Sequence, residues 1–405
     1  MTTKIIISFL LFPIFLLISC QKSDLQPIEN ENSYSVSFQE AKSIASNIVV
    51  NGVLLSNNKS ATLIKKSVKN LKTILDDENQ QTCHVINYNE GGFVVLSADK
   101  RAMPILAYSS NGSFPNIDTD IPFGLMDWIE YAKSYVKKTK KAKKQPTSSD
   151  LTMWNACVMQ ASVSYIANVI SPIDSCGVTP CQDQYETVGP LLQTQWSQGC
   201  GYNNLMPYCN DPGYCNKAPT GCVATAMAQV MKYHNYPTNY NWANMPNSVT
   251  SSSSFGSTEI SGLMYDIGVK VDMQYACDGS SADAQSAVPS GLINGFGYSS
   301  AQYIGYEGTS NYDVVKNELR SCRPVIFKGG ENVGWWILKI YGNGHAWVSD
   351  GFSSAYYCQI GVSTLYLHMN WGWAGSYDGF YAFDNFNPDN HTFNYRSGVV
   401  VNIKP

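Results

Sequence analysis

The sequence predicts an α+β protein, in which one apolar helix packs on a twisted antiparallel sheet and a smaller α+β unit precedes both. Three stretches support this fold class. Residues 221–231 carry Val223, Met227 and Val230 at helical spacing, so one helix face is buried. Residues 365–370 alternate apolar and polar side chains, as a strand does. Residues 83–88 and 92–97, joined by Asn-Glu-Gly, have the pattern of a hairpin.

The helix at 221–231 has a cysteine in its first turn. Cys222 follows Pro-Thr-Gly, where Thr220 is expected to cap the helix and Gly221 to allow a close approach of backbone or substrate. A thiol at a helix N-terminus lies at the positive end of the macrodipole, which lowers its pKa and favours the thiolate. Taken alone, such a cysteine is more often a small buried core residue. Its assignment as a nucleophile therefore depends on a base elsewhere in the chain.

A nucleophilic cysteine needs a base and an orienting group, and both usually lie far away in sequence. Of the five histidines, His84 belongs to the front unit and His391 to a polar loop. His234 lies twelve residues along the same helix, about 18 Å from the thiol at 1.5 Å per residue. His345 and His368 remain as candidates.

The two remaining histidines lie in strand-like stretches. His345 follows a glycine at the expected start of a strand, which leaves room beside the imidazole. Tyr366, His368 and Asn370 share one strand face, so Asn370 can orient a base on a neighbouring strand. We favour His345 as the base and interpret His368 as a partly buried strand histidine with a partner of its own.

Several runs of the sequence resemble a known family. GCVATAMAQVMKYHNYP, GHAWVSDG and HMNWGWAGSYDGF, in this order, and the chain end NIKP are similar to the streptopain family of papain-like cysteine proteases. WSQGCGYN, MYDIGVKVDMQY and GFGYS also match family patterns, across residues 188–405. YNEGGFVVLSADKRAMPILAYSSNGSF resembles the inhibitory pro-segment of that family. The resemblance implies a papain-like fold, a secreted cysteine endopeptidase made as a zymogen, and no cofactor or metal.

The resemblance also implies the catalytic residues. Cys222 would be the nucleophile, His345 its general base and acid, and Asn370 the residue that orients the imidazole. Trp371 would cover that contact with its indole. Gln198 would donate its side-chain amide to the oxyanion, together with the backbone N–H of Cys222. Without the family, Gln198 would be interpreted as a solvated loop residue.

The resemblance further implies a substrate pocket. Ser280, Ser281 and Ala282 would form part of its wall, in an enzyme that favours a hydrophobic residue at P2; an exposed Gly-Ser-Ser loop is the alternative. Trp373 fits core packing and catalysis equally well. The sequence departs from the family in a cysteine-rich stretch between Gln198 and Cys222, and in a longer, more aromatic loop at 334–341. Both flank the expected cleft, so subsite preference is the least transferable property.

The first residues indicate export. Lys4 is followed by an apolar stretch, residues 5–19, which is short for a membrane span. It ends in Leu-Ile-Ser-Cys, typical of a bacterial lipoprotein signal in which Cys20 carries the lipid anchor; an ordinary signal peptide is the alternative. Residues 21–24 resemble a surface-display tether. We expect a precursor held at the outer membrane or cell surface, and a mature form that can be secreted.

The remaining composition narrows the partners. Without Cys20 and Cys222, ten of the twelve cysteines remain, an even number that fits disulfides in an exported chain. Zinc is the rival, but these cysteines lack close CxxC pairs and have no histidine among them. The net charge of −4 and 14% charged residues give no indication of a nucleic-acid partner. The expected partners are protein or peptide substrates, the chain's own pro-segment and, through the lipid, the outer membrane.

The basic run at 137–144, followed by Gln-Pro-Thr-Ser-Ser-Asp, indicates an exposed linker and a cleavage region. Residues 153–170 fit a short helix or a continuation of this linker. The expected segments are a signal peptide at 1–20, a tether at 21–32, an inhibitory pro-domain at 33–136, a linker and processing region at 137–187, and a catalytic domain at 188–405. Two alternatives stay open: another Cys-His amidase of papain-like shape, or a non-catalytic inhibitor or binding protein whose active part is the front unit.

Overall fold

The chain divides into two units, Met1–Ser33 and Tyr34–Pro405. A computed structural model describes, within the second unit, residues 34–47, 66–115, 123–159, 181–305, 311–332, 341–358, 361–382 and 395–405. Several expectations concern residues outside these ranges: the signal with Cys20, the tether, Cys176, His391 and most of the aromatic loop before His345. The side chain of Cys157 is not described either.

The helices are α1 (Phe38–Asn47), α2 (Phe123–Ala142), α3 (Ser148–Met159), α4 (Cys222–His234), α5 (Ser257–Lys270), α6 (Ala284–Ser290) and α7 (Tyr312–Arg320), with the short helical segments η3 (Pro212–Tyr214), η4 (Trp242–Asn244) and η5 (Gly291–Gly295). The strands are β1 (Val68–Leu75), β2 (Gln81–Tyr88), β3 (Phe93–Ser97), β4 (Ile105–Ser109), β5 (Gln184–Val188), β6 (Ser300–Gly305), β7 (Val325–Asn332), β8 (Tyr341–Tyr357), β9 (Val362–Asn370), β10 (Gly379–Ala382) and β11 (Tyr395–Lys404).

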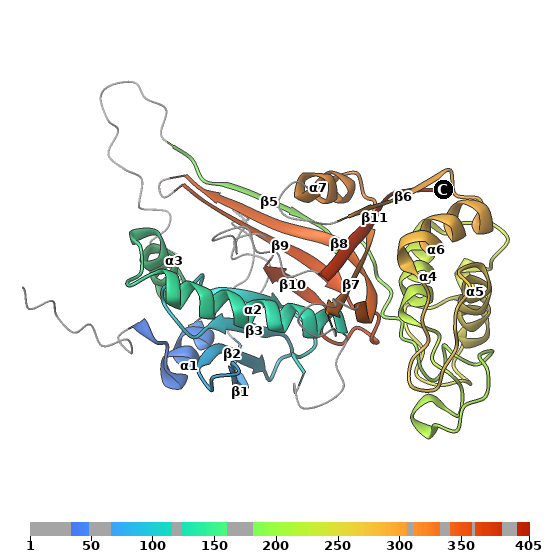
Figure 1. Cartoon of the computed structure of the whole chain (residues 1–405), viewed down its shortest axis with the longest axis horizontal. Helices are drawn as coiled ribbons and strands as arrows, with labels where there is room; N and C mark the ends of the chain where they lie inside the picture. Colours follow the sequence, from blue (N-terminus) through green and yellow to red (C-terminus); the bar gives the residue numbers. More distant parts are fainter. Residues whose placement is uncertain are drawn as a thin grey trace, which may run out of the picture. The chain divides into compact units, whose positions relative to one another are not determined.

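One antiparallel sheet joins the strands of the described residues. Its order is β1-β2-β3-β4-β10-β9-β8-β7-β11-β6, with β5 beside β8 (Figure 1). β1 to β4 come from the expected pro-domain, and β4 pairs with β10 of the expected catalytic part, Tyr108 opposite Phe380 and Ala107 opposite Tyr381. The strands of the expected pro-domain and those of the expected catalytic part thus form one continuous sheet.

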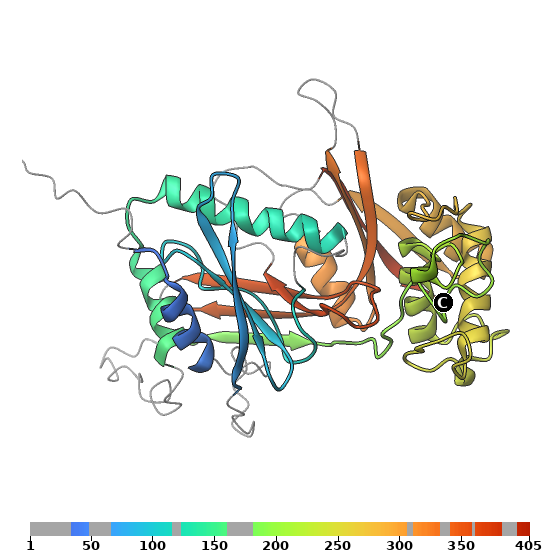
Figure 2. The same cartoon turned by 90° about the horizontal axis from the view of Figure 1, so that it is seen from below.

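β8 separates two hydrophobic cores. One core holds side chains of α2 and β2 to β4 together with Trp347 of β8. The other surrounds α4 and α5 and includes Ala346 and Val348, which point to the opposite face of β8. α4 is buried from Val223 to Met231, as its apolar pattern requires. In Figures 1 and 2, α4, α5 and α6 form one group at the end of the sheet away from α1 and β1.

The α+β class, with a nucleophile-bearing helix and an antiparallel sheet behind a small α+β unit, is confirmed by these elements. The predicted hairpin corresponds to β2 and β3, and the stretch at 365–370 lies in β9. The placement of His345 at a strand start is wrong. Pairing between β7 and β8 extends back to Tyr341, opposite Asn332, so His345 lies inside β8.

The basic run at 137–144 is not a free linker. It begins inside α2, where Lys137 pairs with Asp77 at 2.7 Å and with Glu78 at 2.9 Å. Arg101 donates to the backbone carbonyls of Lys140 and Lys143, which satisfies carbonyl groups at the end of α2. This run is therefore tied to the front unit, and α3 follows it within the segment expected as linker.

Three disulfides occur among the described cysteines, Cys181–Cys358, Cys200–Cys215 and Cys209–Cys277, in place of a zinc site. The even remainder of ten cysteines does fit disulfides, but two of the ten are free thiols. Cys83 is a free thiol buried in β2, where burial raises its pKa to about 12, and it packs as a small apolar side chain. Cys322 is free and exposed after α7. Over the described part of the chain, no helix has both the length and the apolar character of a membrane span.

Candidate active site

Cys222 is the first residue of α4. The residue before it, Gly221, is the N-cap with φ +87°, and no side chain caps the helix. The expectation that Thr220 caps it is wrong, because the Thr220 hydroxyl lies 3.0 Å from Thr225 Oγ1 instead. A Cβ on Gly221 would lie 2.7 Å from Met273 Sδ. Glycine is therefore needed here both for its left-handed backbone and for space.

The thiol of Cys222 meets the backbone of β8. The N–H of Ala346 donates to Cys222 Sγ at 3.3 Å. Burial nevertheless raises the pKa of Cys222 above its usual value, although the N–H groups of Ala346, Val223 and Cys222 itself act in the opposite direction. The expected lowering of the pKa is thus wrong for this arrangement, because no imidazolium balances the desolvation of a thiolate.

The imidazole of His345 is 5% exposed and faces the front unit's core. It stacks on Trp347, with ring centroids 6.0 Å apart and planes 14° from parallel. Its Nε2 lies 3.3 Å from the carbonyl oxygen of Trp371. Burial lowers the pKa of His345 to about 4, against the opposing effect of that carbonyl. The ring is neutral at ordinary pH.

His345 and Asn370 point to opposite faces of the sheet. Asn370 pairs with Val348 across β8 and β9, so it shares the face of Val348 and Ala346. His345, three residues before Val348, shares the face of Trp347. The imidazole therefore points away from the Cys222 thiol and from Asn370, and the candidate residues are in a latent arrangement.

Asn370 is instead held by other groups. Its Oδ1 accepts from Gln229 Nε2 at 3.0 Å and from the Gly372 N–H at 3.1 Å, and its Nδ2 donates to the Thr194 carbonyl at 2.9 Å. Sequence reasoning singled out neither Gln229 nor Thr194. A signal was available for Gln229, which is a long polar side chain in the middle of an otherwise apolar helix.

The tryptophans of the NWGW run differ in their surroundings. Trp371 is 1% exposed, with its ring against Trp347 and Tyr381 at 5.3 Å each. Both its carbonyl and its ring thus belong to the surroundings of His345. The indole N–H of Trp373 has no hydrogen-bond partner within the described residues.

The predicted oxyanion donor and substrate wall flank the start of α4. The Gln198 carbonyl accepts from the Thr220 N–H at 3.0 Å, which ties Gln198 to the turn before Cys222. Ser280 donates to the Pro219 carbonyl at 2.6 Å, and the loop of Ser281 is closed by paired backbone bonds to Gln274. Ala282 packs against the same hydrophobic core as Cys222.

The Cys209–Cys277 disulfide ties the cysteine-rich stretch after Gln198 to the segment leading into the Ser280 loop. The stretch in which the sequence departs from the family is therefore held by a disulfide beside the expected cleft.

His368 has the partner of its own that the sequence interpretation gave it. Its Nδ1 lies 2.6 Å from Asp350 Oδ1, and Asp350 Oδ2 accepts from the Leu192 N–H at 2.8 Å. Burial lowers the pKa of His368, but the carboxylates of Asp350 and Asp378 outweigh it and raise the pKa above the usual value. Burial raises the pKa of Asp378 itself to about 7. This ion pair fixes the loop at Leu192 and does not include the thiol.

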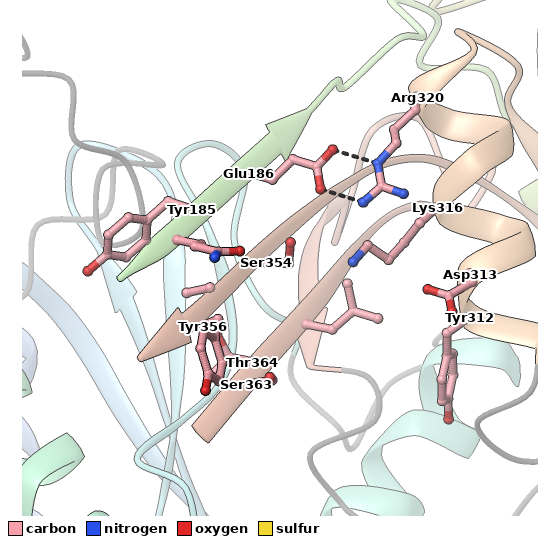
Figure 3. A pocket seen from close by; sticks show the side chains of 13 residues that line it. Tyr185, Glu186, Tyr312, Asp313, Lys316, Arg320, Ser354, Tyr356, Ser363 and Thr364 are labelled. Atoms are coloured by element: carbon pink, nitrogen blue, oxygen red, sulfur yellow. Dashed lines mark hydrogen bonds and ion pairs between the residues drawn. The ribbon is translucent and has the colours of Figure 1, made fainter. Parts of the chain in front are cut away.

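Two cavities lie near these elements. A cavity of about 490 Å³ is bounded by Asn370 and His368 on one side and by residues 109–113 of the front unit on another. A second cavity, of about 430 Å³, lies between β5, β8, β9 and α7 (Figure 3). Arg320 of α7 forms a bidentate ion pair with Glu186 of β5 there, with both distances 2.6 Å. None of the expected site residues lines the second cavity.

Comparison with known proteins places this geometry in a family. A model described as the Peptidase C10 family matches residues 196–239 and 238–381, and one described as Spi protease inhibitor matches residues 33–136. Streptopain of Streptococcus pyogenes is 31% identical, over 94% of both chains. Thiol protease/hemagglutinin PrtT of Porphyromonas gingivalis is 26% identical, over 78% of this chain and 36% of that protein.

A solved structure is similar as well. A fragment of prointerpain A from Prevotella intermedia, solved as a mutant, aligns with a TM-score of 0.57 and 27% identity over 83% of this chain and 99% of that one. The name prointerpain denotes a precursor, in agreement with the inhibitor-like segment at 33–136 of this chain. The chain belongs to the peptidase C10 family, as a zymogen that carries an inhibitory pro-domain in front of a papain-like cysteine endopeptidase.

Proposed function

We propose that the mature enzyme hydrolyses peptide bonds with Cys222 as nucleophile and His345 as general base and acid. Asn370 orients the imidazole, and Trp371 shields that contact from water. The Gln198 side chain and the Cys222 N–H donate to the oxyanion. Gln198 is suited to this role, because its backbone is tied to the turn before Cys222 while its side-chain amide is partly exposed and without a partner among the described residues.

The chemical steps follow from these roles. The Cys222 thiol gives its proton to His345, and Sγ forms a bond to the substrate carbonyl carbon. The carbonyl π electrons move to the oxygen and return as the peptide C–N bond breaks, while His345 donates the proton to the leaving amine. His345 then takes a proton from water, whose oxygen attacks the thioester. The acyl–sulfur bond breaks, and the thiol recovers its proton.

One observation carries the proposal. The N–H of Ala346 donates to Cys222 Sγ at 3.3 Å, so two stretches 124 residues apart in sequence are in contact. Since His345 is the neighbour of Ala346, its imidazole can reach the thiol without the strand being carried across the molecule. We propose that this strand segment turns over on maturation, so that the imidazole comes to the face of β8 on which the thiol lies.

Latency is supported by the contacts of the pro-domain with the catalytic sheet. Tyr108 of β4 stacks on Phe380 of β10 at 5.3 Å, and the Tyr366 hydroxyl donates to the Ile105 carbonyl at 3.1 Å. Trp128 of α2 packs edge-on against Tyr381 at 4.9 Å. These contacts stabilise the core in which His345 stacks on Trp347. The pro-domain therefore favours the position of His345 on the face of β8 opposite to the thiol.

For substrate choice, we propose a pocket that takes a hydrophobic residue at P2. Its wall would include Ser280, Ser281 and Ala282, which follow the Cys209–Cys277 disulfide and flank the start of α4. The contact of Ser280 with Pro219, three residues before the nucleophile, supports this placement.

For the precursor, we propose a lipoprotein signal at 1–20 with the lipid on Cys20, a tether at 21–32, a pro-domain at 33–136, a processing region within 137–187 and a catalytic domain at 188–405. The Cys181–Cys358 disulfide and the pairing of β5 with β8 argue for cleavage before Cys181, because a cut after it would leave the residues before the cut attached to β8. Such a cut would separate the enzyme from an anchor at the outer membrane or cell surface.

Expression of the full chain and its Cys222→Ala variant tests this function. Wild type should yield a trimmed soluble enzyme that cleaves casein, and Cys222→Ala a full-length, membrane-bound and inactive precursor. His345→Ala should behave like Cys222→Ala, whereas His368→Ala should keep substantial activity. Caseinolysis by Cys222→Ala would refute the assignment. A soluble, trimmed Cys222→Ala product in cells without other proteases would refute self-release alone.

A further inference from the structure

Gln229 is a buried polar residue on the helix that carries the nucleophile. It is 0% exposed, and it lies two turns after Cys222 on the same side of α4. Buried amides need hydrogen-bond partners. All the partners of Gln229 belong to segments that carry the proposed catalytic residues.

The network fixes which way the Gln229 amide lies. Its Oε1 accepts from the Trp196 N–H at 3.3 Å and from the Thr194 hydroxyl at 2.9 Å. A backbone N–H can only donate, so the end of the amide near Trp196 must be the oxygen. The NH₂ end therefore points to Asn370 Oδ1, at 3.0 Å.

The orientation of Asn370 follows from separate groups and agrees. The Gly372 N–H, which only donates, lies 3.1 Å from Oδ1, and the Thr194 carbonyl, which only accepts, lies 2.9 Å from Nδ2. Asn370 is 3% exposed, and both ends of its amide have partners. Both amides are thus held in one orientation by a closed set of neutral groups.

We propose that Gln229 is a positioning residue that keeps Asn370 Oδ1 turned towards α4, the side of the sheet on which the Cys222 thiol lies. This inference rests on the proposed function, in which Asn370 orients His345. When the imidazole reaches this face, its N–H meets this oxygen and shares it with the donors already there. Without Gln229, Oδ1 loses one of its two donors, and only the Gly372 N–H and the Thr194 carbonyl hold the Asn370 amide, so it is aligned less firmly with the imidazole. A less firmly held orienting group lowers turnover even where the nucleophile and base are intact.

The test uses full-length precursors, processed by immobilised wild-type enzyme and normalised by active-site titration. Gln229→Met keeps most of the side-chain volume and removes both polar ends. We expect its kcat to fall by roughly ten- to a hundredfold, as for other small misplacements of a catalytic group, with KM little changed. In an Asn370→Ala background, Gln229→Met should cause no further loss in kcat, because the two residues act through one contact.

Tyr298→Phe is the matched control. Tyr298 is 2% exposed, and its hydroxyl lies 3.2 Å from His234 Nδ1, at the end of α4 opposite to Cys222. This variant should lower the melting temperature as Gln229→Met does, yet keep the wild-type kcat per titrated site.

Two results would overturn the inference: an unchanged kcat for Gln229→Met, or a full additional loss in the Asn370→Ala background. The second would show that Gln229 acts by general stabilisation or through another residue. If Asn370→Ala itself retains the wild-type kcat, the orienting role of Asn370 is refuted, and so is this inference. If Asn370→Ala is slow and Gln229→Met is not, only this inference falls.

Discussion

Acid should destabilise the latent position of His345, and the size of the effect can be worked out from its surroundings. Burial lowers the pKa of His345 to about 4, from an ordinary value of 6.5. Between these pH values, the unfolded chain binds a proton at His345 that the folded precursor does not bind. The free energy of unfolding therefore rises with pH over this range. The contribution of the buried, neutral His345 to the free energy of unfolding is fully present above pH 6.5 and is lost as the pH falls towards 4. About 2.5 pH units at ~1.4 kcal/mol each amount to ~3.5 kcal/mol.

The assay compares free energies of unfolding in urea for the Cys222→Ala precursor and for the same precursor carrying His345→Gln, between pH 7.5 and 4.5. Whole-protein curves alone are not sufficient, because other histidines titrate. Burial also lowers the pKa of His234 to about 4, whereas that of His368 is raised, so its contribution has the opposite sign. The difference between the two precursors isolates His345.

Below pH 6.5, the stability advantage of the His345 precursor over the His345→Gln precursor should shrink by about 1.4 kcal/mol per pH unit. His234→Gln is the control: it should remove a slope of similar size, and the His345 imidazole resonances of the precursor should titrate as before. A slope that His345→Gln leaves unchanged would refute the reasoning. So would an imidazole pKa of 6.5 or more for His345, measured by NMR in the Cys222→Ala precursor.

Two further predictions concern the orienting group and the pro-domain. Asn370→Ala should retain measurable peptide hydrolysis with a lower kcat, because the imidazole loses alignment but not its chemistry; complete loss in a folded variant would indicate a more direct role. Residues 33–145, added in trans, should inhibit the mature enzyme, and Tyr108→Ala should weaken this inhibition about tenfold or more, because the stack on Phe380 and its buried area are lost. An unaffected hydrolysis rate at large molar excess of the wild-type segment would exclude inhibition by docking.

Local patterns in the sequence were sufficient for several elements. The apolar spacing of residues 221–231 predicts α4, because a helix that buries one face must repeat its apolar residues every three to four positions. Alternation predicts β9, and the runs around Asn-Glu-Gly predict β2 and β3. The order of the Cys222, His345 and Asn370 stretches indicated the family, since each stretch is a short run of specific residues.

Cysteine pairing required the tertiary structure. Cys83 is unpaired because it lies inside a buried strand, whereas Cys181 meets Cys358 across 177 residues of chain. An even count of cysteines could not distinguish these cases, because pairing depends on distances between segments that are remote in sequence.

The sequence by itself predicted which residues carry the chemistry and on which kind of element each one lies. It could not determine the face to which His345 points. That face follows from the register of β8 against β7 and β9, and a shift of one residue would reverse it. Nor could it determine that Gln229 holds Asn370, 141 residues away. Registers and buried networks are set by packing between distant segments, and packing exists only once the chain has folded.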